Sequence, residues 1–171
     1  MAKEAQCIMD ELAGWEQNIA VWTPSDEKLV HPKDPHHHVW LWTHWMVHQT
    51  ARILASDIVI NRARAQTLLT ASISNTAILE DAISYQAKLC DVLKKKTESQ
   101  LNEFKSMRAG VATIASYDLL WPLFILATSA STTADTMAWI IRSSDEIAEK
   151  FGIRQAKLFG DSMRQIYKPG I

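Results

Sequence analysis

Residues 137–152 have the sequence MAWIIRSSDEIAEKFG, and this stretch decides the fold class of the chain. Its large apolar residues recur at the spacing that places them on one face of a helix. The residues on that face are Met137, Ile140, Ile141, Ile147, Ala148 and Phe151. Gly152 follows at the position where a glycine in the left-handed conformation commonly ends a helix. The stretch therefore predicts an amphipathic helix that buries one face.

The helical pattern continues on the C-terminal side of this stretch and becomes less regular on the N-terminal side. Residues 153–167 predict a last helix, whose inward face is Ile153, Ala156, Phe159, Met163 and Ile166. The apolar run over residues 119–129 predicts a buried helix that Pro122 starts or kinks, because proline fits only the first turn without disturbance. Residues 101–106 indicate a short helical turn, and no element is assigned around Gly110.

Three further helices are predicted in the N-terminal half of the chain. Residues 75–95 predict a helix capped by Asn75 and Thr76, with the inward face Leu79, Ala82, Gln86, Leu89 and Leu93. Residues 37–68 predict a long central helix, whose inward residues include Trp42, Trp45, Gln49, Ile53 and Ile60. Residues 3–21 predict an N-terminal helix that ends before Pro24. We therefore expect residues 1–171 to form a single all-α domain, an array of six to seven helices around one core.

The composition agrees with a packed helical protein. Apolar residues make up 47% of the 171 residues and charged residues 22%, with only five glycines and five prolines. The 18 basic and 19 acidic residues give a formal net charge of −1, so the chain as a whole has no electrostatic footprint for nucleic acid. Cys7 and Cys90 are too few for a disulfide framework or a four-cysteine metal site, and they suit a reducing compartment.

No segment of the sequence predicts secretion or insertion into a membrane. Residues 1–4 lack the charged-then-apolar order of a secretory signal. The most apolar run, residues 119–127, has roughly half of the 20 or so residues that are needed to cross a bilayer. We therefore expect the protein in the nucleus or cytoplasm, with no membrane partner and no direct binding to DNA.

All six histidines fall between His31 and His48, which raises the hypothesis of a metal site. His44 and His48 lie four residues apart on the predicted central helix, so both imidazoles could reach one ion, with a third ligand from residues 36–38. The sequence has no His-Glu-x-x-His motif, and the nearest carboxylates lie off that helical turn. We therefore expect no metal and no cofactor, and exposed or hydrogen-bonded histidines are the alternative that we prefer.

Tryptophans on two predicted helices could line a pocket for a flat or apolar ligand. Packing in the core is the alternative, since tryptophans at helical spacing more often belong to a core. Arg52, one turn after His48, is expected to be half-buried and to pair with Asp57 or Asp118 ahead of any ligand. No catalytic residue is predicted. The candidate ligand-binding residues are Trp42, His44, Trp45, His48, Arg52 and Trp121.

Four segments of the chain occur in an order that resembles a known family. They are residues 22–24 (WTP), 42–54 (WTHWMVHQTARIL), 120–127 (LWPLFILA) and 151–156 (FGIRQA). This order is similar to the C-terminal half of the regulatory domain in fungal zinc binuclear cluster transcription factors. In that family an aromatic-rich helix ends in an Ala-Arg-Ile-Leu-like stretch, and a Trp-Pro-Leu-Phe-like segment precedes two closing helices. The resemblance covers nearly the whole chain, but the six cysteines of the family's DNA-binding module are absent.

The resemblance implies a non-enzymatic regulatory or interaction domain in transcription regulation, tied to secondary metabolism. We expect such a domain to bind a protein partner or a second copy of itself, and it could also bind a small apolar ligand. The alternative is a small helical enzyme of fungal secondary metabolism that binds an apolar substrate in a cavity lined by tryptophan and histidine. A further alternative is a truncated homologue that folds only with a missing N-terminal half.

Overall fold

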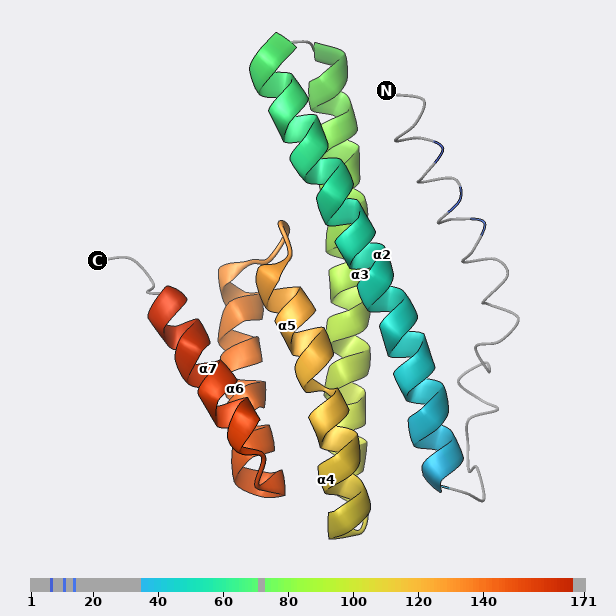
Figure 1. Ribbon diagram of the computed structural model, residues 1–171, viewed down its shortest axis with the longest axis vertical. Helices are drawn as coiled ribbons and strands as arrows, with labels where there is room; N and C mark the ends of the chain where they lie inside the picture. The colour runs from blue at the N-terminus through green and yellow to red at the C-terminus, as the bar shows by residue number, and fades with distance from the viewer. Residues whose placement is uncertain (1–6, 8–10, 12–13, 15–34, 71–72, 168–171) are drawn as a thin grey trace. The chain divides into compact units, whose positions relative to one another are not determined.

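The computed structural model of the chain is all-α, as predicted (Figure 1). It describes residues 7, 11, 14, 35–70 and 73–167, and no strand occurs among them. The predicted helix over residues 3–21 lies outside the described residues apart from residues 7, 11 and 14, which are helical. The described residues divide into two compact units, residues 1–82 and 83–171. The number of helices around one core stays a prediction.

The first unit contains the helix α2 (Pro35–Thr70), which confirms the long central helix predicted over residues 37–68. Its buried side chains recur every three or four residues, as the helical period requires. They include Trp42, Met46, Gln49, Ile53, Ser56, Ile60 and Ala63. Trp45, predicted to point inward, is only half-buried. The described part of the first unit therefore consists mainly of one amphipathic helix.

The next helix, α3 (Ile73–Phe104), is longer than the prediction over residues 75–95. The three lysines at residues 94–96 lie where the predicted helix ends, and positive charge there suits a helix C-terminus. Instead the buried face that contains Leu93 continues beyond them through Thr97, Leu101 and Phe104, and this buried spacing carries the helix onward. The short turn predicted at residues 101–106 is in fact the end of α3, and Asn75 lies inside the helix instead of capping it.

The helices α4 (Ala109–Asp118) and α5 (Leu120–Thr128) follow one another with only Leu119 between them. Leu119 itself has helical dihedral angles, φ −70° and ψ −17°, so the helical spacing of side chains runs through the junction. Pro122 has no N–H group to donate to the carbonyl of Asp118, which explains why α5 begins here. The region around Gly110, to which no element was assigned, is thus helical.

Residues Ala109–Thr128 together form a 20-residue run that is long and apolar enough to cross a membrane. This corrects the sequence-based view that the apolar run is too short. The buried helix of a folded domain passes the same test of length and composition. One face of the run is buried, through Ala112, Ala115, Leu119, Leu123 and Leu126. The absence of a membrane partner stays a prediction.

The last two helices, α6 (Ala134–Phe151) and α7 (Arg154–Ile166), form an antiparallel hairpin (Figure 1). The side chain of Thr133 accepts a hydrogen bond from the N–H of Thr136 and caps α6. Gly152 ends α6 with φ 71°, in the left-handed conformation that the sequence predicted. Helix α6 packs against α4, α5 and α7, which makes it the central element of the second unit.

Small residues allow α7 to approach α6 closely. A Cβ atom at Gly160 would lie 3.3 Å from the Cβ atom of Ser144 on α6. Ala156 and Met163 are buried on the same face of α7, as predicted, and Phe159 is half-buried. Ile166 is largely exposed, which contradicts its predicted inward position, because it lies in the last turn of α7. The hairpin is therefore held by small residues at its centre.

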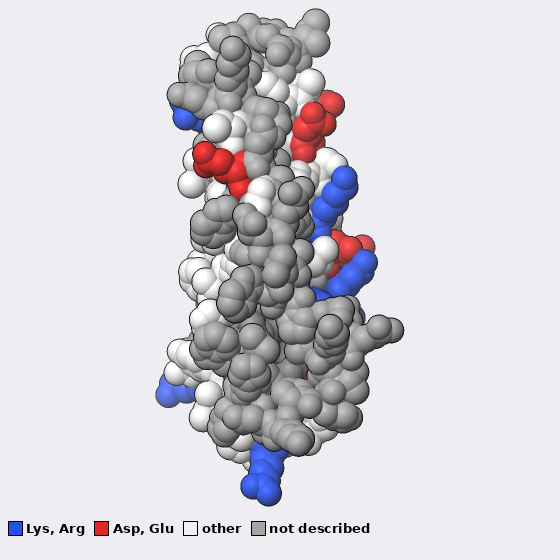
Figure 2. All heavy atoms as spheres, turned by 90° about the vertical axis from the view of Figure 1, so that its right-hand side faces the viewer, with Lys and Arg blue, Asp and Glu red and all other residues white. Residues whose placement is uncertain are grey.

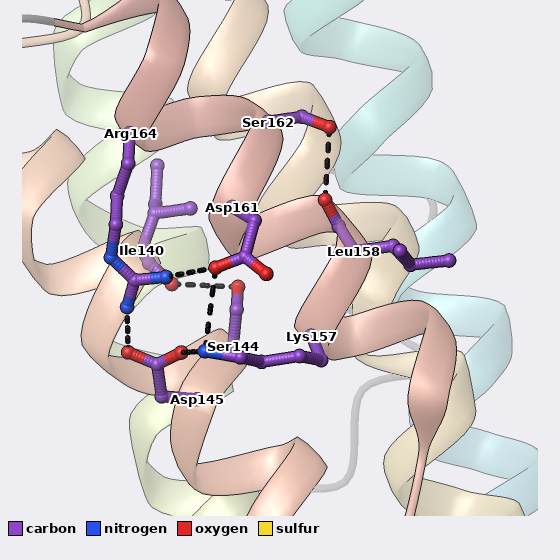
Figure 3. A network of polar contacts seen from close by, with 8 residues as sticks. All are labelled: Ile140, Ser144, Asp145, Lys157, Leu158, Asp161, Ser162 and Arg164. Carbon is purple, nitrogen blue, oxygen red and sulfur yellow. Dashed lines mark hydrogen bonds and ion pairs between the residues drawn. The ribbon is translucent and has the colours of Figure 1, made fainter.

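Charged residues link the same two helices at the edge of this contact (Figure 3). Arg164 on α7 forms ion pairs with Asp145 on α6 and with Asp161 one turn before it on α7. Lys157 also reaches both carboxylates, with nitrogen to oxygen distances of 3.5 Å to Asp145 and 3.3 Å to Asp161. These side chains are partly exposed to solvent, so each pair contributes about 1 kcal/mol or less.

Candidate functional site

Five of the six predicted ligand-binding residues lie on α2, within the first unit. The rings of Trp42 and Trp45 stack with their centroids 5.3 Å apart and an interplanar angle of 24°. His44 is exposed and His48 is half-buried. Arg52 is only 2% exposed, so its predicted half-burial is wrong. It is enclosed because the buried face of α2 is wide enough to include position 52 beside Ile53.

Trp121, the sixth predicted residue, lies on α5 in the second unit. It is 47% exposed and stacks on Phe124, with ring centroids 5.9 Å apart. Core packing, the alternative considered for the tryptophans, is therefore wrong for Trp121. A pocket that includes all six residues stays a prediction.

The structure also locates the histidines of the metal hypothesis. His44 and His48 lie one turn apart on α2, as the sequence requires. Among the described residues, no group of three or more His, Cys, Asp or Glu side chains lies close enough together to hold a metal ion. The side chains of residues 36–38 are not among those described.

A polar cluster joins α3 to the connection between α5 and α6. The side-chain oxygen of Gln86 accepts hydrogen bonds from the hydroxyl of Ser129 and from the backbone N–H of Ser131, both at 3.0 Å. The sulfur atom of Cys90 lies 3.3 Å from the hydroxyl of Ser129. Gln86 and Cys90 are buried on α3. The cluster satisfies buried polar groups and fixes this connection, which is a structural role.

Two lysines shift the acidity of Glu146 on α6. Burial raises the pKa of its carboxyl group, but two lysines together outweigh burial and hold that pKa below its ordinary value. The Nζ atoms of Lys105 and Lys150 lie 2.8 Å and 2.9 Å from its Oε1 atom. Lys105 follows the end of α3, so this ion pair ties α3 to α6 within the second unit.

The surface feature that the sequence analysis missed is a stripe of large apolar side chains on α4 and α5. The exposed members of this stripe are Ile114, Tyr117, Trp121 and Phe124. Their steps of three, four and three residues place them on one face, opposite the buried face of the same run. Between 43% and 71% of each residue is exposed. We refer to these four residues as the α4–α5 stripe.

The α4–α5 stripe extends toward α7 and carries almost no charge. The rings of Phe124 and Phe159 lie 6.4 Å apart, so α7 borders the stripe at its C-terminal end. Asp118 is the only charged residue within Ala109–Thr128. Elsewhere, on the face shown in Figure 2, basic and acidic side chains both occur among the described residues, and neither sign covers a continuous area. The α4–α5 stripe is therefore apolar, with Asp118 as the one charged residue of its two helices.

Comparison of the chain with protein-family models, with curated proteins and with solved structures found no match.

Proposed function

We propose that the chain is a non-enzymatic interaction domain that binds another protein surface through the second unit. The observation that carries this proposal is the α4–α5 stripe. Contiguous exposed apolar surface on a folded domain commonly marks a protein interface. Aromatic residues are enriched in the centres of such interfaces because they bury a large area with few rotatable bonds.

The finer form of the proposal is a regulatory role like that of the fungal transcription factor domain that the sequence resembles. Support comes from the order of the motifs at residues 42–54, 120–127 and 151–156, and from the all-α fold. A net charge of −1 supports action through proteins without direct contact to DNA. In this proposal the chain works in the nucleus or cytoplasm, and the regulation of secondary metabolism is its context.

A reporter assay tests this function. The chain is fused to a DNA-binding domain of known specificity, and transcription from its target promoter is compared with that of the DNA-binding domain alone. We expect the fusion to change transcription at least severalfold and Trp121→Ala to remove most of the change. Ser162→Ala, at an exposed position of α7 outside the stripe, is the matched control. A fusion that is stably expressed and leaves transcription unchanged contradicts the regulatory role.

A second candidate function is binding of a small apolar ligand beside α2, as in the enzyme alternative. The stacked rings of Trp42 and Trp45 favour it, because paired indole rings offer a flat apolar surface. Native mass spectrometry of the purified chain would show a co-purified molecule as an added mass. In that case Trp45→Ala should remove the added mass and Tyr117→Ala, at an exposed position of α4, should not.

A further inference from the structure

We infer that the second unit pairs with a second copy of this chain through the α4–α5 stripe, with the two stripes antiparallel. This inference rests on the proposed interaction role and specifies its partner. The stripe has the spacing at which the residues of one helix fit between those of an equivalent helix. An isologous pair of this kind needs only one self-complementary surface, and such two-fold dimers are the commonest oligomers.

The antiparallel direction follows from the residues in each layer of the contact. A two-fold axis at the level of Leu119 places Ile114 of each copy opposite Phe124 of the other. The same axis places Tyr117 opposite Trp121. Every layer then contains at least one aromatic ring, and the central layers contain aromatic pairs, which add stability beyond the area that they bury. A parallel pair would place two isoleucines in one layer and two tryptophans in another, with unequal spacing between the helices.

The area of the stripe is that of a weak, transient dimer. A fully buried aromatic side chain removes roughly 150–250 Å² from water, so four large side chains that are about half exposed contribute roughly 300–500 Å² per copy. A standard interface buries roughly 800 Å² per partner, and smaller ones are weaker and transient. Flanking residues of α5 and α7, where Phe159 borders the stripe, can supply part of the difference. We therefore expect a monomer–dimer equilibrium in the micromolar range.

A protein surface fits the stripe better than a lipid surface does. Helices that lie on membranes carry lysine and arginine beside their apolar face to hold anionic headgroups. Ala109–Thr128 contains neither residue, and its single charge is the acidic Asp118. The opposite face of the same run is already buried, and both α4 and α5 pack against α6. A second apolar helix would cover the exposed α4–α5 stripe, and this contact needs no charged residue.

Two isoleucines provide a matched test. Ile114 lies in the stripe and is 71% exposed, whereas Ile166 lies at the end of α7, outside the stripe, and is 76% exposed. Sedimentation velocity of the full chain is measured across the micromolar range for the wild type, Ile114→Glu and Ile166→Glu. We expect the wild type to dimerise, Ile114→Glu to weaken the dimer by at least about tenfold and Ile166→Glu to leave it unchanged. Circular dichroism verifies that all three proteins are folded.

Cross-linking tests the direction of the pair. In a Cys7→Ser background, the single variants Ile114→Cys and Phe124→Cys are oxidised separately and as a mixture. The antiparallel arrangement predicts a disulfide-linked dimer mainly in the mixture. Efficient linkage within either variant alone would overturn the antiparallel arrangement.

The dimer is overturned if the wild type remains monomeric throughout the concentration range. It is also overturned if Ile114→Glu and Ile166→Glu weaken dimerisation equally. A monomer that binds neutral phosphatidylcholine vesicles through Ile114 would assign the stripe to a lipid surface and also overturn it. A monomer that still changes reporter transcription in a Trp121-dependent way would remove the dimer and leave the proposed interaction with another protein intact.

Discussion

Replacing Gly152 with alanine should destabilise the second unit through the backbone alone. Gly152 has φ 71° and ψ 23°, and its N–H donates to the carbonyl of Ala148 at 3.1 Å. A Cβ atom added there would meet nothing within 4 Å, so no steric contact contributes. The left-handed conformation costs an L-residue about 1–2 kcal/mol. Alanine also restricts the unfolded chain, which offsets about 0.4–1 kcal/mol of that cost.

The net expectation for Gly152→Ala is a loss of about 1 kcal/mol, or about a fivefold change in the unfolding equilibrium constant. Gly152→Asn should cost less, because asparagine adopts the left-handed conformation more readily than alanine. Gly110→Ala is the matched control. Gly110 lies in the first turn of α4, has open space around its Cβ position and has no positive φ. The same substitution should there be neutral or stabilising by up to about 1 kcal/mol.

Urea unfolding followed by far-ultraviolet circular dichroism measures these differences as shifts of the midpoint. Both glycines lie in the second unit, so one transition reports on both, provided that its slope is unchanged. The expected order of stability is Gly110→Ala at or above the wild type, then Gly152→Asn, then Gly152→Ala. If Gly152→Ala were as stable as the wild type, or if both glycines responded with the same sign, the backbone argument would be refuted.

Three further substitutions test contacts in the second unit. Glu146→Gln should lower the free energy of unfolding by less than about 1 kcal/mol at neutral pH. The difference should disappear as the pH falls through the lowered pKa of Glu146, because its stabilising charge is then lost from the folded state. Gly160→Leu should cost at least about 1–3 kcal/mol in thermal or urea unfolding, since the added side chain meets Ser144. Gln86→Leu should cost about 1–3 kcal/mol in the same assay, because the hydroxyl of Ser129 and the N–H of Ser131 both lose Gln86 as an acceptor.

Each of these substitutions has a control at an exposed position of the same helix. Glu149→Gln on α6 removes a carboxylate for which the described residues show no ion pair. Its effect on the free energy of unfolding should not show the pH dependence expected for Glu146→Gln. Ser162→Leu on α7 adds the larger side chain at an exposed position, and Lys88→Leu on α3 introduces the same leucine at an exposed position. Equal losses at a control and at its partner would show that the contact assigned to the partner is not the cause.

Local periodicity was sufficient to predict most helices of the second unit. The hairpin of α6 and α7 follows from a regular apolar spacing and from Gly152, both of which are properties of neighbouring residues. The end of α3 was missed because the lysines at residues 94–96 form a local stop signal that the buried Leu101 and Phe104 override. Packing against the rest of the unit therefore determined where α3 ends, because the local charge and the spacing of buried residues gave different ends.

The candidate site was predicted less well, because burial depends on which side of a helix is covered. Trp121 and Phe124 have the same apolar character as the buried Leu123 and Leu126, and only the fold separates the two faces. The spacing of Ile114, Tyr117, Trp121 and Phe124 was present in the sequence as a signal. It was overlooked because no helix was assigned around Gly110, so residues 114 and 117 were not connected to residues 121 and 124.

The two cysteines differ in exposure, so their labelling can report on local opening of the second unit. Cys7 is exposed, whereas Cys90 is buried beside Ser129. A thiol reagent can therefore modify Cys90 only when that region opens transiently, while Cys7 reacts without such an opening. Under conditions of rapid closing, the ratio of the two labelling rates measures the free energy of opening, with no added dye or tag. The native chain thus carries both a sensor of its own local unfolding and an internal reference for it.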